Sequence, residues 1–497
     1  MVMILSCMIW LLFTCILVTA LQYLRKAISI KLPPGPTPFP IIGNLLKLGD
    51  KPHRSLANLA KIHGPLMTLQ LGQVTTIVIS SSTIAKEILK NHDLSFCNRT
   101  VLDAILAKQH GEFAMPWLPV STAWRSLRKI SNSYIFTPQK LDANQYLRRQ
   151  KIQQLLAHVQ ESCNAGKAID VGQAAFNTTL NLLSNTVFSV DLADPSSEFA
   201  REFKKLVWGI MEEAGKPNLG DYFPVLRKID LQGIRRRMGV HFGKMLEMFD
   251  NLIDQRLKQR QLHGSDQPKD MLDTLLNITE DKSEEINRDQ IKHLFLDLFA
   301  AGTDTTSSTL EWAMTELIRN PKTLSKARLE LEQTIGKGNQ FEESDVSRLP
   351  YLQAIVKETL RLHSPIPLLL PRKSSSNVEI CGYVVPEGAQ VLVNAWAIGR
   401  DGTTWDKPDS FVPERFLGLD VDVKGRNFEV IPFGAGRRIC PGLPLAMRML
   451  YLMLGTLINS FDWKLEGGLK PEKMDMDDKF GITIQRAQPL HAIPVAL

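Results

Sequence analysis

The chain has 497 residues, 44% of them hydrophobic and 22% charged, a composition that suits a globular protein with a sizeable buried core. Its 59 basic and 52 acidic residues give a net charge of +7 without a long Lys/Arg run, which argues against nucleic-acid binding and favours an acidic partner protein or an anionic membrane surface. The six cysteines contain no CxxC pair, which argues against a disulfide framework and indicates a reduced, cytosolic protein body.

Residues 1–24 contain no charged side chain and predict a transmembrane helix. Such a helix would be about 36 Å long, enough to cross a hydrocarbon core of about 30 Å. Arg25, Lys26 and Lys31 follow at once, so the positive-inside rule places the rest of the chain on the cytosolic face. The alternative is a cleaved signal peptide, favoured by the small residue Ala20 but lacking the basic segment that should precede the apolar stretch.

Residues 25–44 predict a stop-transfer segment followed by a stiff hinge. Five prolines lie within 33–40, and proline fixes φ and prevents a helix. We therefore expect an extended spacer between the membrane anchor and the protein body.

The body, residues 45–497, is predicted to be one mainly helical domain with a minor sheet, because helical periodicity covers most of its length. No internal repeat or second proline-rich linker divides it. Helices are expected at 147–160, 203–213, 240–261, 286–319, 320–335, 351–362 and 443–460, and strands at 66–71, 75–80, 382–386 and 390–394.

Within the helix expected at 286–319, residues 301–306 (Ala-Gly-Thr-Asp-Thr-Thr) cluster types that are poor in helix interiors. The Thr305 hydroxyl can donate back to the Ala301 carbonyl, which would bend the helix and open a groove. The alternative is a polar kink that faces solvent.

Cys440 is the strongest candidate for chemistry. It ends the segment Ile-Pro-Phe-Gly-Ala-Gly-Arg-Arg-Ile-Cys at 431–440, directly before the helix expected at 443–460. Gly434 and Gly436 permit a tight backbone path, and the amides and dipole of a helix N-terminus stabilise a thiolate. A thiolate there can bind iron and donate electron density to it. Taken alone, Cys440 could equally be a buried structural cysteine.

Phe433, Gly436, Arg438 and Cys440 occupy every fixed position of the haem-binding signature of the cytochrome P-450 family, which the chain resembles over essentially its whole length. The resemblance implies that family's fold: a large helical domain with a long kinked central helix and minor β-sheets. It also implies haem b with iron ligated by the Cys440 thiolate, and electrons from NADPH through a flavoprotein reductase. Localisation in the endoplasmic reticulum membrane is implied as well.

The resemblance assigns roles to further residues. Thr305 becomes the oxygen-activating hydroxyl and Asp304 its proton supplier. The residues expected to bind the cofactor are Trp124, Arg128, Arg372, Phe433, Arg438 and Cys440. A buried triad that supports the haem loop is expected from Glu358, Arg361 and Arg415, with a structural and not a catalytic duty. Candidate docking charges for the reductase are Arg125, Lys129, Arg437 and Arg448.

The implied reaction is the NADPH- and O2-dependent hydroxylation of a C–H bond in a lipophilic small molecule. The segments that match the family's substrate-recognition segments, 101–120, 299–301, 366–370 and 480–482, are largely apolar, which favours such a substrate. Candidate pocket residues are Ala301, Leu368, Leu369 and Ile482. In stretches such as 76–82 and 393–400 the chain is similar to plant geraniol 8-hydroxylases and related terpenoid hydroxylases, which makes a geraniol-like monoterpenol the first expected substrate.

Several other functions remain open at this level. The substrate could be a sesquiterpene, a diterpene or tyrosine, since relatives in the same group act on these. A haem-thiolate isomerase or dehydratase would need neither O2 nor reductase, but such enzymes typically lack the threonine that this chain has at 305. A haem sensor would not need the Asp304–Thr305 pair.

Overall fold

The computed structural model describes residues 31–193, 198–263, 270–280 and 286–497, and seven residues within 6–17. The anchor expected at 1–24 and the basic residues at 25 and 26 therefore lie outside the described residues, apart from those seven. Within the described part, one helix is long and apolar enough to cross a membrane, namely α18 (Leu443–Ser460). More than half of that helix is buried inside the protein, as in the core helix of a globular domain.

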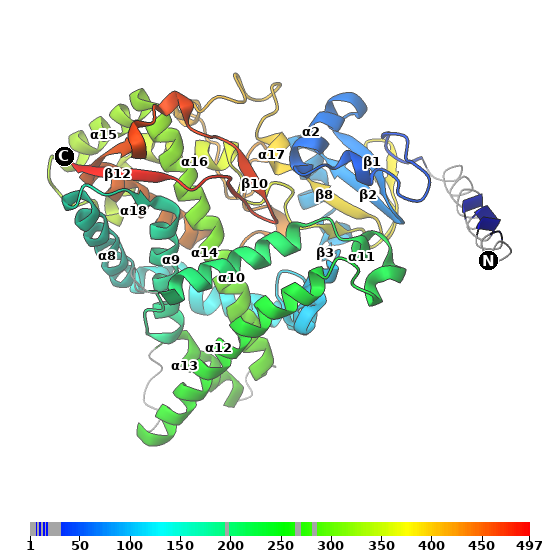
Figure 1. Cartoon of the computed structure of the whole chain (residues 1–497), viewed down its shortest axis with the longest axis horizontal. Helices are drawn as coiled ribbons and strands as arrows, with labels where there is room; N and C mark the ends of the chain where they lie inside the picture. The colour runs from blue at the N-terminus through cyan, green and yellow to red at the C-terminus, as the bar shows by residue number, and fades with distance from the viewer. Residues whose placement is uncertain are drawn as a thin grey trace.

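The prediction of a mainly helical domain is confirmed, and each of the seven expected helices is present, with bounds that differ from the expected ones by at most six residues. The helices of ten residues or more are α2 (Pro52–His63), α6 (Thr122–Ser131), α8 (Gln145–Asn164), α9 (Val171–Phe188), α10 (Glu198–Gly215), α12 (Ile234–His263), α13 (Met271–Glu280), α14 (Arg288–Arg319), α15 (Pro321–Ile335), α16 (Pro350–Leu362) and α18. In Figure 1 the sheet that contains β1, β2 and β8 lies at one end of the molecule and α8, α15 and α18 at the other, with α14 between them.

The largest sheet has the strand order β1-β2-β8-β5-β3. Its strands are β1 (Leu66–Leu71), β2 (Val74–Ile79), β8 (Gln390–Val393), β5 (Arg372–Lys373) and β3 (Asn98–Arg99). β2 and β8 are parallel, whereas the other neighbours are antiparallel. The last two strands have two residues each, and their register sets Arg99 opposite Arg372.

The remaining strands form three small sheets. A hairpin of β10 (Asp478–Phe480) and β11 (Ile484–Arg486) stands alone, as do β6 (Val378–Ile380) and β7 (Tyr383–Val385). The third sheet has the order β4-β12-β9, with β4 (Ile169–Asp170), β12 (His491–Ala496) and β9 (Phe461–Leu465).

The helix α14 passes through both halves of the hydrophobic core. It begins at a capping box in which Asn287 and Gln290 satisfy each other's backbone amides. Its apolar residues up to Ala300 belong to one core cluster with α10 and α12, and those from Leu310 onward belong to another with α16 and α18. The polar segment 301–309 lies between these two clusters, so it is the part of α14 that is available for chemistry.

Candidate functional site

The loop before Cys440 is shaped by two glycines. Gly434 and Gly436 have φ values of 68° and 69°, a conformation that other residues rarely adopt. A Cβ atom on Gly436 would lie 2.1 Å from the carbonyl oxygen of Leu89, so no side chain fits there. The Cys440 amide donates to the Phe433 carbonyl oxygen at 3.0 Å and closes the loop.

The Cys440 sulfur lies at the start of α18, as the sequence predicts. The backbone amides of Gly442 and Leu443 and the guanidinium of Arg128 favour its thiolate, but burial has the larger effect and raises the pKa of the thiol. The amides at the helix N-terminus thus favour the thiolate in the expected direction, although burial opposes them with a larger effect. A metal cation bonded to the sulfur would favour the deprotonated form.

Three arginines, the buried Arg372 and Arg438 and the half-buried Arg99, gather beside this loop without a carboxylate. Within the described part of the chain, Arg99, Arg372 and Arg438 form no ion pair and donate only to carbonyl oxygens. Arg99 donates to Leu370 at 2.8 Å, Arg372 to Phe96 at 3.1 Å, and Arg438 to Cys97 at 2.8 Å. Burial, followed by mutual repulsion, lowers the pKa of Arg372 to about 10. Three closely spaced cations, two of them buried, call for anionic groups from a ligand.

Trp124 and Arg128 lie on α6 at the edge of the same site. The Arg438 guanidinium lies 4.7 Å from the centroid of the Trp124 ring, a cation–π contact. Burial lowers the pKa of Arg128, and its attraction to Cys440 opposes this effect. The structure thus brings together Trp124, Arg128, Arg372, Arg438 and Cys440, which the sequence identified separately.

Arg99 is a site residue that the sequence reasoning missed. Its place follows from the two-residue pairing of β3 with β5, which no periodicity signals. In the sequence it stands out only as the middle of an Asn-Arg-Thr glycosylation sequon.

The segment 301–309 of α14 holds the predicted oxygen-activating pair. Ala301 is solvent-accessible although Ala300 and Thr303 beside it are buried. Cys440 is accessible too, although protein atoms surround it closely. The Thr305 hydroxyl donates to the Ala301 carbonyl oxygen at 2.7 Å, as predicted. A ligand site requires accessible residues inside the protein, and Ala301 and Cys440 meet this requirement.

The Asp304 carboxyl contacts the β10–β11 hairpin. It is buried and accepts hydrogen bonds from the Thr483 hydroxyl at 2.5 Å and from the Gln485 side-chain amide. Burial raises the pKa of Asp304 to about 6, and the two donors oppose that rise. Neither Thr483 nor Gln485 was singled out from the sequence, because both lie some 180 residues further along the chain.

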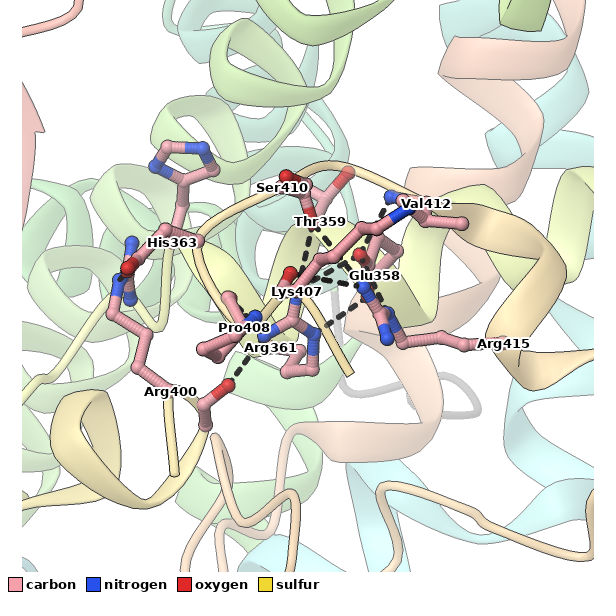
Figure 2. Close-up of polar contacts among 12 residues, drawn as sticks. Glu358, Thr359, Arg361, His363, Arg400, Lys407, Pro408, Ser410, Val412 and Arg415 are labelled. Carbon is pink, nitrogen blue, oxygen red and sulfur yellow. Dashed lines mark hydrogen bonds and ion pairs between the residues drawn. The ribbon is translucent and has the colours of Figure 1, made fainter. Parts of the chain in front are cut away.

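The expected triad is present (Figure 2), with Glu358 and Arg361 buried and Arg415 half-buried. Glu358 accepts from Arg361 at 2.7 and 2.8 Å and from Arg415 at 3.0 Å. Arg361 also donates to the carbonyl oxygens of Pro408 at 2.7 Å and Ser410 at 3.0 Å. The triad therefore fastens α16 to the segment 399–415, which is a structural duty.

A largely apolar cavity of about 110 Å³ lies beside the β10–β11 hairpin. Its lining includes Leu368, Leu369 and Ile482, three of the four predicted pocket residues, together with Phe480. The fourth, Ala301, does not line this cavity.

The four candidate docking charges differ in their surroundings. Arg437 pairs with Asp93 at 3.1 Å, and Arg448 pairs with Asp142 and Glu343, each at 2.7 Å. Arg125 and Lys129 lie on the exposed side of α6. The partners of Arg437 and Arg448 reduce the charge that these two residues offer to a docking protein.

The donor set fits haem. The Cys440 thiol is a ligand for iron, and the arginines without carboxylate partners suit the two carboxylates that haem carries. Phe433 precedes the glycine turn and is only partly buried beside this site.

Comparison with known proteins agrees with this geometry. Residues 33–491 match the family model for cytochrome P450. The geraniol 8-hydroxylase of Catharanthus roseus is 57% identical over 493 residues, which is 99% of each chain. That of Swertia mussotii is 58% identical over 486 residues, 98% of each. The drimenol monooxygenase of Persicaria hydropiper is 55% identical over 489 residues, 98% of this chain and 97% of that one.

Proposed function

The chain belongs to the cytochrome P450 family, and from this premise we propose that it hydroxylates a C–H bond of a terpenoid, with geraniol-like monoterpenols as the first substrates. The observation that carries the proposal is an identity of 57–58% with two geraniol 8-hydroxylases along nearly the whole chain. The drimenol monooxygenase adds a second terpenoid oxidation among the relatives. The apolar cavity beside Leu368 and Ile482 suits a lipophile of this kind.

Members of the family are monooxygenases that use haem with a cysteine thiolate on iron and receive electrons from NADPH through a reductase. When bound, haem supplies the oxygen-activating chemistry. The balanced reaction is R–H + O2 + NADPH + H⁺ → R–OH + H2O + NADP⁺. We assign iron ligation to Cys440 and the two haem carboxylates to Arg99, Arg128, Arg372 and Arg438, with the Trp124 ring stacked on Arg438 and Phe433 beside the sulfur.

The protein's own part in the reaction lies in orientation and proton supply. We assign Thr305, whose hydroxyl donates to Ala301, to the handling of protons at the oxygen-binding side. Asp304 supplies those protons from a buried position one residue earlier in α14. The Glu358 triad holds α16 and the 399–415 segment in place.

We further assign residues 1–24 to a single-pass anchor in the endoplasmic reticulum membrane, residues 25–44 to the hinge and residues 45–497 to a catalytic domain on the cytosolic face. The basic residues at 25, 26 and 31 support this orientation. The electron donor would then be the NADPH-cytochrome reductase of the same membrane, which meets Arg125 and Lys129 on α6.

Co-expression with that reductase tests the proposal. Microsomes are supplied with monoterpenols, a sesquiterpenol, a diterpene and tyrosine, with microsomes carrying Cys440→Ala as the control. We expect an alcohol product from a monoterpenol only when both NADPH and O2 are present. Conversion that needs neither would indicate an isomerase or dehydratase, and oxidation of tyrosine alone would overturn the terpenoid assignment.

A further inference from the structure

Asp304 receives its hydrogen bonds from one small element, the β10–β11 hairpin. The Thr483 side chain is fully buried and donates to one carboxyl oxygen, and Gln485 donates to the other. Ser308, one turn further along α14, donates to the Ile484 carbonyl oxygen at 2.9 Å. The hairpin therefore runs along α14 beside the acid, with its polar groups directed at that helix.

The hairpin is fixed at both of its ends. At its base Asp478 accepts from the buried His53 ring at 3.0 Å and pairs with Lys51 at 3.0 Å. At its tip the Ile482 amide donates to the Met211 carbonyl oxygen of α10 at 2.8 Å. A Cβ atom on Gly215 would lie 2.2 Å from the Gly481 carbonyl carbon, so the tip is packed directly on α10. An element held this firmly keeps its donors in one position.

The same tip lines the apolar cavity that the proposed function assigns to the substrate. Phe480, Gly481 and Ile482 form part of its wall, together with Ala214 and Gly215 at the end of α10. A single hairpin thus contacts both the space for the substrate and the acid beside Thr305.

Few charges reach the Asp304 carboxyl. Lys204 of α10 is the one charged side chain that acts on it among the described residues, and the hairpin contributes only the neutral donors Thr483 and Gln485. A buried carboxylate depends on the hydrogen bonds that it accepts, because water cannot solvate it. The two hairpin donors are thus the direct means by which the protein can tolerate the ionised acid.

We propose that Thr483 and Gln485 are positioning residues that hold the Asp304 carboxyl and set the pH at which it exchanges its proton. In that role the hairpin that forms part of the substrate wall also controls the proton source of the reaction. The inference rests on the proposed function in one respect, the assignment of Asp304 as proton supplier.

Thr483→Val removes the donor at nearly constant volume, and Thr483→Ser retains it. We would measure the unfolding temperature of the purified holoenzymes from pH 5 to 8, without NADPH. Ionisation of Asp304 should appear as a step in the plot of unfolding temperature against pH. This step should move to higher pH by about one unit in the Val variant, because one hydrogen bond to the carboxylate is lost. It should stay in place in the Ser variant and be absent from Asp304→Asn.

A second readout follows the reaction itself. With reductase and NADPH present, the share of electrons released as hydrogen peroxide is measured over the same pH range. The pH at which this share changes should shift in the same direction in Thr483→Val and remain unchanged in Thr483→Ser. If Thr483→Val does not fold, Gln485→Met removes the other donor. It should shift the pH dependence of both the unfolding temperature and the peroxide share to higher pH.

Coincident curves for Val, Ser and the unaltered protein would overturn the proposal, as would a step of unchanged size in Asp304→Asn; Asp221, whose pKa burial also raises to about 6, contributes equally to every variant. The unfolding measurement needs no substrate and the peroxide measurement needs no particular one. If no terpenoid is hydroxylated, the substrate assignment fails, while the inference about Thr483 and Gln485 is still decided.

Discussion

At the scale of single residues, the need for an anionic ligand follows from three arginines that lack a carboxylate partner among the residues that the structure describes: Arg99, Arg372 and Arg438. Each guanidinium is satisfied only by carbonyl oxygens, and the pKa of each is lowered by burial. Buried arginines usually have a carboxylate partner, because an uncompensated charge in the interior is costly. The haem carboxylates would provide that compensation.

Arg99→Met should therefore weaken haem retention. Losing one charge-assisted hydrogen bond of about 1.5–3 kcal/mol corresponds to roughly a 10- to 100-fold rise in the haem dissociation constant. Transfer of haem to an acceptor protein measures this change. Arg437→Met is the matched control, since Arg437 lies at the surface and pairs with Asp93. Equal haem loss from both variants would contradict the assignment of Arg99.

Asp304 predicts a pH dependence of stability. Its pKa is about 6 in the folded protein, above the ordinary value of about 3.9, so the folded state disfavours the ionised form. Below about pH 4 Asp304 is protonated in both the folded and the unfolded protein. Above about pH 6 it is ionised in both, and the folded protein bears the full cost of ionisation, on the order of 3 kcal/mol. Stability from this group is therefore lost as the pH rises between these values.

Asp304→Asn removes that dependence. The difference in unfolding temperature between the variant and the unaltered protein should rise in favour of the variant as the pH rises from about 4 to about 6. Thermal scans at several pH values test this expectation. A difference that does not vary with pH would show that the pKa of Asp304 is not raised in the folded protein.

At the scale of elements, α14 also holds the loop that receives Arg438. Asp297 of α14 accepts from the Met115 amide at 2.8 Å and lies 3.3 Å from Nε2 of His110, whose other ring nitrogen is 2.8 Å from His293. Arg438 in turn donates to the Met115 carbonyl oxygen at 3.2 Å. The loop around Met115 is thus fastened between the central helix and the Cys440 segment.

Asp297→Leu should break this connection and leave a buried amide and a buried histidine without their acceptor. The expected loss is about 2–4 kcal/mol of stability, together with weaker haem retention through Arg438. The unfolding temperature and the rate of haem release measure the two effects. Asp289→Leu, on the exposed start of the same helix, should change neither.

The long helices could be predicted because their periodic patterns extend over three turns or more, and β1 and α18 have the expected bounds. β3 and β5 could not, because a two-residue strand has no period and its partner is fixed by tertiary packing. The hydrogen-bond partners of the Asp304 side chain could not be predicted from the sequence for a similar reason, because they lie on a hairpin far along the chain.

At the scale of the whole molecule, the apolar cavity that we assign to the substrate is assembled from distant segments. Residues from β1 and β2, from the end of α10, from 367–371 and from the β10–β11 hairpin meet around it. Motifs within one segment can identify Leu368 or Ile482 as candidates, but only the complete fold shows that they share one space.

Leu368→Phe should reduce the volume of this cavity and so weaken substrate binding. We expect the dissociation constant of a monoterpenol to rise roughly tenfold, since overpacking of this kind typically costs 1–3 kcal/mol. Substrate-induced spectral titration measures the change. Leu419→Phe, at an exposed position, provides the control, and equal affinities for both variants would remove Leu368 from the pocket.

The claim on which the whole account depends is that the Cys440 sulfur binds the haem iron. The most direct test is the absorption spectrum of the reduced, carbon monoxide-bound protein, for the unaltered chain and for Cys440→Ala. We predict the Soret band of a thiolate-ligated haem in the former and its loss in the latter. A thiolate band that persists without Cys440, or a nitrogen-ligated spectrum in the unaltered protein, would contradict the account.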